Sequence, residues 1–313
     1  MSDSSRADLI LIGVTLLAGL SWIFSREAVQ LMPPLLFMAL RFLLAGSLLA
    51  WLGRRQLAGI NRAQCWRGMR VGLTFGFAMC FWVLGLTHTD HVGEGAFLTI
   101  LGVLMVPIIG KLVFAESAPV STWLALPVAL CGLALLALKD GFNPQPGQWL
   151  FLTSAFGFAF YYALNTRAAN HSESRQRDGS VRAEERVPAL ALTTLMVLTV
   201  ALVTALASLL LEPWQATFND FAPMLWLWIP ASAIIGTSAR FYLQTLAQSL
   251  SVHSHGVVIM IMEPVWVALF AAAWFGEQMT LTQLAGCTLI FLALLVNRWQ
   301  ALRSMLYRSL SRH

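Results

Sequence analysis

Long apolar stretches, separated by short polar segments, run along the whole chain. Ten of them have membrane-spanning length, over residues 9–27, 33–52, 68–88, 92–114, 119–138, 147–166, 188–211, 223–247, 253–275 and 281–298. About 20 apolar residues in a helix cross a hydrocarbon core roughly 30 Å thick, and a helix satisfies its own backbone hydrogen bonds. The pattern therefore predicts an all-α, polytopic membrane protein with ten transmembrane helices.

The two halves of this pattern resemble each other in order along the chain. Residues 18–26 match 159–167, Pro34 matches Pro188, and the segment 113–116 that ends in Glu116 matches 274–277, which ends in Glu277. Each half contains five spans, and an odd number reverses the direction in which the second half enters the membrane. We therefore expect two inverted five-helix repeats, over 1–140 and 141–298, with a site near the midplane where they meet.

Two polar segments lie outside the predicted spans. Residues 168–187 are rich in Ser, Arg and Glu and show no apolar periodicity, which predicts a solvated, partly disordered linker. Residues 299–313 place leucines and arginines at helical spacing, which predicts a cytoplasmic amphipathic tail in the headgroup plane.

The formal net charge of +5 invites a nucleic-acid partner, but the placement of the charges favours a membrane topology instead. On the ten-span arrangement, 15 of the 20 Lys and Arg residues fall in loops on one side, and the opposite loops carry only Arg26 and Lys139. Basic loops remain in the cytoplasm. We therefore predict a multi-pass protein of the cell (inner) membrane with both termini cytoplasmic, and no nucleic-acid partner.

A short pattern near the C-terminal end carries a family resemblance. Glu263-Pro264 lies within the ninth span, Gly276-Glu277 ends it, and Gln283-Leu284-Ala285-Gly286 opens the tenth. The arrangement resembles EamA-type ten-helix transporters of the drug/metabolite transporter superfamily. The resemblance implies a transporter in which spans one, three, four, six, eight and nine line a central cavity, with spans five and ten peripheral. The first half has no Glu-Pro twin, so the resemblance implies no particular substrate.

Charged residues within the spans are the main candidates for the site. A charge near the bilayer centre costs about 2.5–3.5 kcal/mol on insertion scales, so it needs a partner or a wet cavity. Glu263 lies near mid-depth and precedes Pro264, which is expected to kink the helix and free backbone carbonyls. Arg240 and Arg41 are candidates to pair with Glu263 or to hold a substrate carboxylate. A structural carboxylate, and an Arg41 that snorkels to the surface, are the alternatives.

Aromatic side chains recur on the spans expected to line the cavity. The candidate substrate contacts among them are Trp22, Tyr162, Tyr242, Phe81 and Trp82. Tyr162 and Tyr242 are the informative members, because a tyrosine hydroxyl within a span needs a hydrogen-bond partner.

Three further residues are candidates for gating or proton-linked roles. Glu94 lies near the start of the fourth span, where an outer helix cap is the alternative, and His253 and His255 open the ninth. His88 and His91 have too few neighbouring ligands to predict a metal site. The four cysteines show no CxxC spacing and are expected to be free thiols.

No nucleotide-binding, hydrolase or zinc-protease motif occurs in the chain, so we expect no catalytic residues and no cofactor. The sequence favours an exporter of a small metabolite, such as an amino acid or related amphiphile, working by alternating access. An importer or lipid-carrier flippase of the same fold is an alternative, as is a non-transporting scaffold or intramembrane enzyme. The expected partners are the substrate and the lipid bilayer, with protons as a candidate coupling ion, in a monomer or homodimer.

Overall fold

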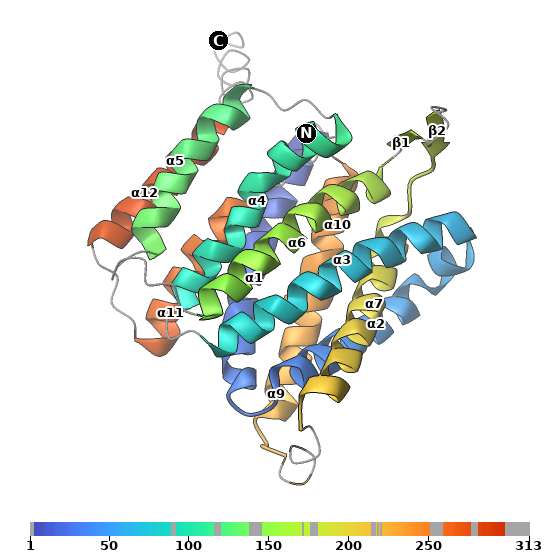
Figure 1. The fold of residues 1–313 in the computed structure, drawn as a ribbon, viewed down its shortest axis with the longest axis horizontal. Coiled ribbons are helices and arrows are strands. Elements are labelled where there is room, and N and C mark those ends of the chain that lie inside the picture. The colour runs from blue at the N-terminus through green and yellow to red at the C-terminus, as the bar shows by residue number, and fades with distance from the viewer. Residues whose placement is uncertain are drawn as a thin grey trace, which may run out of the picture.

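The helices of the chain pack into one bundle (Figure 1). The computed structural model describes residues 3–88, 92–115, 120–137, 146–170, 172–175, 181–213, 217, 219, 221–250, 259–276 and 281–297. The helices of the first half are α1 (Asp3–Val29), α2 (Pro34–Ala58), α3 (Arg62–Thr87), α4 (Val92–Phe114) and α5 (Val120–Ala137). The second half contains α6 (Pro146–Ala169), α7 (Ala189–Leu211), α9 (Leu225–Ala231), η1 (Ser232–Ala239), α10 (Arg240–Ser249), α11 (Glu263–Phe275) and α12 (Leu281–Asn297).

The bundle has the surface of a membrane protein. Four helical segments in the described residues are long and apolar enough to cross a bilayer, namely 6–29, 34–58, 62–87 and 189–211, and shorter apolar helices accompany them. Large apolar side chains such as Leu112, Leu210 and Leu281 are highly exposed on the outside. Exposed apolar surface on this scale suits a lipid environment and would be costly in water.

The helix packing repeats when the two halves are exchanged. When each helix of one half is exchanged for its counterpart in the other, the α2–α7, α5–α12 and α4–α11 contacts are unchanged. The same exchange turns the contacts of α1 with α10 and α11 into those of α6 with α3 and α4. Figure 1 shows α5 and α12 side by side at one edge of the bundle. Such a contact set is what two inverted five-helix repeats produce, and the predicted all-α, two-repeat fold is confirmed.

Two short strands pair within the linker predicted to be solvated and partly disordered. Residues 172–175 (β1, Ser172–Arg175) and 181–184 (β2, Val181–Glu184) pair as antiparallel strands, with Ser172 opposite Glu184. The two strands are short and mostly polar, so the apolar periodicity that identifies a strand in a sequence is absent here. Residues 299–313, the predicted amphipathic tail, lie outside the described residues.

Two predicted spans are not uniform α-helices. The eighth changes from α9 to the π-helical η1 and back to α10. In the ninth, residues 259–262 form a 3₁₀ turn, and the α-helix begins at Glu263 with Pro264 in its first turn. A proline is tolerated there because the first turn of a helix leaves its N–H groups unpaired. Pro264 therefore marks a change of helix type.

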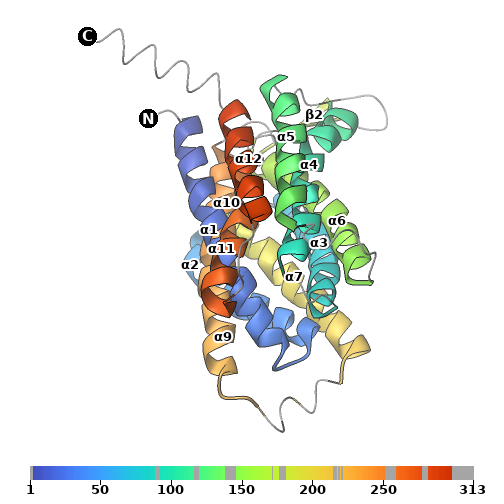
Figure 2. The same cartoon turned by 90° about the vertical axis from the view of Figure 1, so that its left-hand side faces the viewer.

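The two ends of the bundle differ in their polar contacts. At one end, which we name the basic end, α2 and α6 finish near Arg55 and Arg167, and Arg67 donates to the backbone oxygens of Arg167 and Glu185. At the opposite end, Glu212 accepts hydrogen bonds from the first backbone N–H groups of α2. Figure 2 shows the start of α1 and strand β2 at one end and α9 at the other.

Candidate functional site

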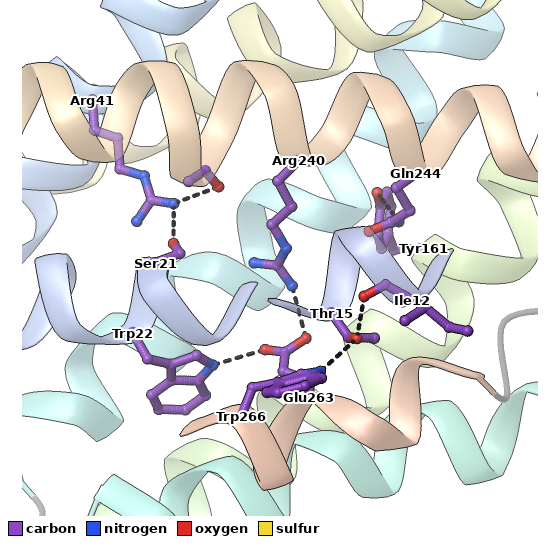
Figure 3. Close-up of polar contacts among 11 residues, drawn as sticks. Ile12, Thr15, Ser21, Trp22, Arg41, Tyr161, Arg240, Gln244, Glu263 and Trp266 are labelled. Atoms are coloured by element: carbon purple, nitrogen blue, oxygen red, sulfur yellow. Dashed lines mark hydrogen bonds and ion pairs between the residues drawn. The ribbon is translucent and has the colours of Figure 1, made fainter. Parts of the chain in front are cut away.

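A buried ion pair lies at the centre of the bundle. Arg240 Nη2 lies 3.0 Å from Oε2 of Glu263, and both side chains are at least nine-tenths buried. The pair joins α10 to α11 (Figure 3). Glu263 occupies the first turn of α11, where the positive end of the helix dipole favours a carboxylate. A single buried charge at this position would carry a large desolvation cost, so each member of the pair stabilises the other.

Trp22 of α1 donates a second hydrogen bond to the Glu263 carboxylate. Its indole Nε1 donates to Glu263 Oε1 at 2.7 Å, so the two carboxylate oxygens have different partners. The Trp22 ring packs edge-on against Trp82 of α3, with centroids 4.8 Å apart. Glu263 thus connects helices from both halves of the chain, at the place where inverted repeats carry a substrate site.

A small cavity adjoins this group. Its volume is about 30 Å³, which holds roughly two water molecules. Seven helices from both halves line it: α1, α2, α3, α4, α6, α10 and α11. The lining residues are Ser21, Trp22, Arg41, Phe75, Met79, Trp82, Ala96, Thr99, Ile100, Phe158, Tyr162, Arg240, Phe241 and Glu263. A metabolite does not fit in this volume, so the structure has the site in a closed form.

Arg41 is a second buried guanidinium in the lining. Its Nε donates to Thr237 Oγ1 at 2.6 Å, Nη1 donates to Ser25 Oγ at 2.8 Å, and Nη2 donates to Ser21 Oγ at 2.6 Å and to the Gly236 carbonyl at 3.0 Å. These acceptors are all neutral. Arg41 is only 2% exposed, so the predicted alternative of a side chain that snorkels to the surface does not hold.

The π-helical segment η1 makes room for Arg41. Gly236 lies in its middle, and a Cβ there would lie 2.7 Å from Ser21 Oγ and 3.1 Å from Arg41 Nη2. The missing side chain lets α1 and the guanidinium approach the Gly236 carbonyl. π-Helical turns occur frequently at functional sites, because they release backbone groups from the regular helix ladder.

Most of the predicted substrate-binding residues meet in this one place. Glu263, Arg240, Arg41, Trp22, Trp82 and Tyr162 all line the cavity. Phe81 instead packs against the exposed Phe77, and Tyr242 is half-buried against the hydrophobic core. Successive residues of a helix differ by about 100° in direction, so Phe81 and Tyr242 point away when their neighbours Trp82 and Phe241 face inward. Neither residue lines the cavity.

The predicted gating residues lie outside the described part of the molecule. This applies to His253 and His255 and to the side chain of Glu94. Cys65, Cys80 and Cys131 are free thiols. Within the described residues, no group of three metal-binding side chains occurs.

The sequence reading missed a second polar cluster, between α6 and α10. Gln244 Nε2 donates to the Tyr161 hydroxyl at 2.8 Å, and Asn165 Nδ2 donates to Thr245 Oγ1 at 3.2 Å and to Gln248 Oε1. The signal available in the sequence was polar residues four apart within apolar spans, at 161 and 165 and at 244 and 248. That spacing puts each pair on one helix face.

Comparison with known proteins agrees with this architecture. The family model described as the EamA-like transporter family matches residues 5–138 and 180–299. A solved structure titled "Crystal structure of protein" is 22% identical, has a TM-score of 0.72, and covers 96% of this chain and 98% of its own; at that identity it supports the fold alone. A search of curated proteins finds no match. The family model covers most of the chain in two segments, and the protein therefore belongs to the EamA-like transporter family, a family of multi-pass membrane transporters.

Proposed function

We propose that this transporter exports a small metabolite, such as an amino acid or related amphiphile, across the cytoplasmic membrane. Its basic end would face the cytoplasm. The observation that carries the proposal is the Trp22–Glu263–Arg240 group, which lies buried between the two halves and beside a polar cavity. Intramembrane charges of this kind ordinarily mark substrate or ion pathways.

The charges of the site suit a substrate with a carboxylate. Among the described lining residues, Arg41 and Arg240 are cationic and Glu263 is anionic. Arg240 Nε is buried and has no hydrogen-bond partner, so this guanidinium has donor capacity to spare. A substrate carboxylate would accept a hydrogen bond there, and a substrate amine would bind Glu263. The aromatic wall formed by Trp22 and Trp82 would take the apolar part.

The closed cavity requires movement for transport. A volume of about 30 Å³ excludes any metabolite, so the helices around Glu263 must separate before a substrate enters. Inverted halves supply two related arrangements, each open to one side. No nucleotide-binding motif occurs in the sequence, so a gradient would drive active transport, and a proton gradient is the one we propose to test first.

The test is transport by purified protein in liposomes loaded with labelled amino acids, nucleosides or polyamines, with and without a pH gradient. We expect efflux of an amino-acid-like probe, and we expect Glu263→Gln to abolish it or to change its pH dependence. Glu27→Gln is the matched control, because Glu27 also accepts an indole N–H, from Trp274 at 3.0 Å, but in an exposed position. Folded Glu263→Gln protein that transports at wild-type rates at every pH would refute the proposed role.

A further inference from the structure

The polar cluster between α6 and α10, which we name the α6–α10 seam, has more hydrogen-bonding capacity than the protein uses. Four of its side-chain atoms are buried without any partner: Asn165 Oδ1, Thr166 Oγ1, Gln244 Oε1 and Gln248 Nε2. All four side chains are at most 2% exposed. Each unsatisfied buried group costs about 1–3 kcal/mol, so a group of four in one place calls for a ligand or a function.

The seam continues directly from the ion pair. Arg240, Gln244 and Gln248 are spaced four residues apart in α10, so they form one row, about 6 Å per step, from Glu263 toward the basic end. Figure 3 shows Arg240 and Gln244 on the same helix, with Tyr161 against Gln244. On α6, Tyr162 lines the cavity and the adjacent Tyr161 begins the seam. The unpaired groups thus lie between the cavity and the basic end.

The chemistry of the seam selects for uncharged polar groups. Its described side chains are amides and hydroxyls with no formal charge: Tyr161, Asn165, Thr166, Asn170, Gln244, Thr245 and Gln248. Two of the unpaired atoms are amide oxygens that need a donor, one is an amide nitrogen that needs an acceptor, and the Thr166 hydroxyl serves as either. A hydroxyl or carboxamide group supplies both kinds of partner.

We propose that the α6–α10 seam is a second substrate subsite, which binds hydroxyl or amide groups of the substrate on its way between the ion pair and the basic end. The inference rests on the proposed transport function. When α6 and α10 separate during transport, substrate groups would take the place of the hydrogen bonds of Asn165 to Gln248 and of Asn170 Nδ2 to the Gln248 carbonyl. On this proposal, the four unpaired atoms find hydrogen-bond partners only when substrate occupies the subsite.

The first test measures whether the seam opens, and it needs no substrate. In a background with all four cysteines replaced by alanine, Thr166→Cys is exposed to a membrane-impermeant, cationic methanethiosulfonate reagent from the basic end. Thr194→Cys is the control, because Thr194 is fully buried near the same end of α7 and donates to Leu190 O. We expect Thr166→Cys to react at least tenfold faster. Equal rates would overturn the proposal, since they would show a permanently closed seam that holds at most water.

The second test separates binding from structural support. The double variant Asn165→Leu/Gln248→Met removes both partners of one hydrogen bond together with two unpaired atoms. It also removes the bond of Asn165 to Thr245, so its thermal stability should stay close to that of the wild type. We expect transport of the labelled probe that the wild type carries to fall at least tenfold, through a raised KM. Lower stability with unchanged transport would refute the subsite. The labelling test requires no transport, so the two proposals fail separately: if Glu263→Gln transports normally while the seam variants lose transport, the proposed role of Glu263 is refuted and the subsite stands.

Discussion

Trp22 donates its indole N–H to Glu263 across 241 positions of sequence and 2.7 Å of space. The bond joins α1 of the first half to α11 of the second, and the same carboxylate holds Arg240 of α10 through its other oxygen. Glu263 is therefore a junction of three helices. A conformational change that separates α1, α10 and α11 must break one of these bonds, and substrate groups that offer the same charges would lower that cost.

The ion pair predicts strong coupling between its two members. Glu263→Gln alone leaves the buried Arg240 without its counter-charge and should lower stability by about 3 kcal/mol. The double variant Glu263→Gln/Arg240→Met should recover most of that stability and should still fail to transport. Thermal unfolding of the two single variants and the double variant measures the coupling. Additive effects would show that the pair contributes no interaction energy.

The indole–carboxylate bond predicts a specific cost for Trp22→Phe. Phenylalanine keeps an aromatic ring against Trp82 but removes the donor, so stability should fall by about 1.5–3 kcal/mol, the range for a hydrogen bond to a charged group. Trp228→Phe is the control. This buried indole stacks on Phe24 of α1, with ring centroids 6.0 Å apart, and lies outside the lining of the cavity. Equal losses for the two variants would assign the effect to ring size.

The close approach at Gly236 predicts opposite effects for two glycine substitutions. Gly236→Ala places a Cβ 2.9 Å from Ser21 Cβ, so α1 or Arg41 must move, and stability should fall by about 1–3 kcal/mol. Gly13→Ala meets no atom within 4 Å in α1 and should stabilise the protein by about 0.5–1 kcal/mol. Thermal unfolding of both variants checks the sign. A Gly236→Ala variant as stable as wild type would contradict the packing of η1 on α1.

Glu212 predicts a stability effect at the end opposite the basic loops. Its two carboxylate oxygens accept from the backbone N–H groups of Leu35 and Leu36, at 2.8 and 2.9 Å, and Oε2 also accepts from Ser208. Glu212→Ala removes the cap of α2 and should cost about 1–2 kcal/mol. Glu27→Ala, which loses one exposed bond, should cost less. Transport per folded molecule should remain normal, and its loss would show a gating role for Glu212.

The charge distribution predicts the orientation of the protein. Reporter fusions after Arg62, Ser180 and His313 should all report the cytoplasm, because 15 of the 20 basic residues lie in loops on that side. A fusion after Lys139 is the control and should report the exterior. An external signal from any of the first three fusions would contradict the predicted topology.

The hydrophobic pattern is enough to predict the solvent, the number of spans and the two-repeat plan, because a hydrophobic run of spanning length satisfies its backbone only as a helix. It also predicts that Glu263 needs a partner or a water-filled cavity, since an isolated charge in a membrane is costly. Which arginine pairs with Glu263 depends on how the helices pack, because Arg41 and Arg240 are chemically the same residue and differ only in their surroundings. Helix phase decided that Trp82 faces the cavity and Phe81 does not. The α6–α10 seam forms only when the polar faces of two helices 80 positions apart pack together. Each polar face can be recognised in the sequence, but the pairing of the two faces cannot.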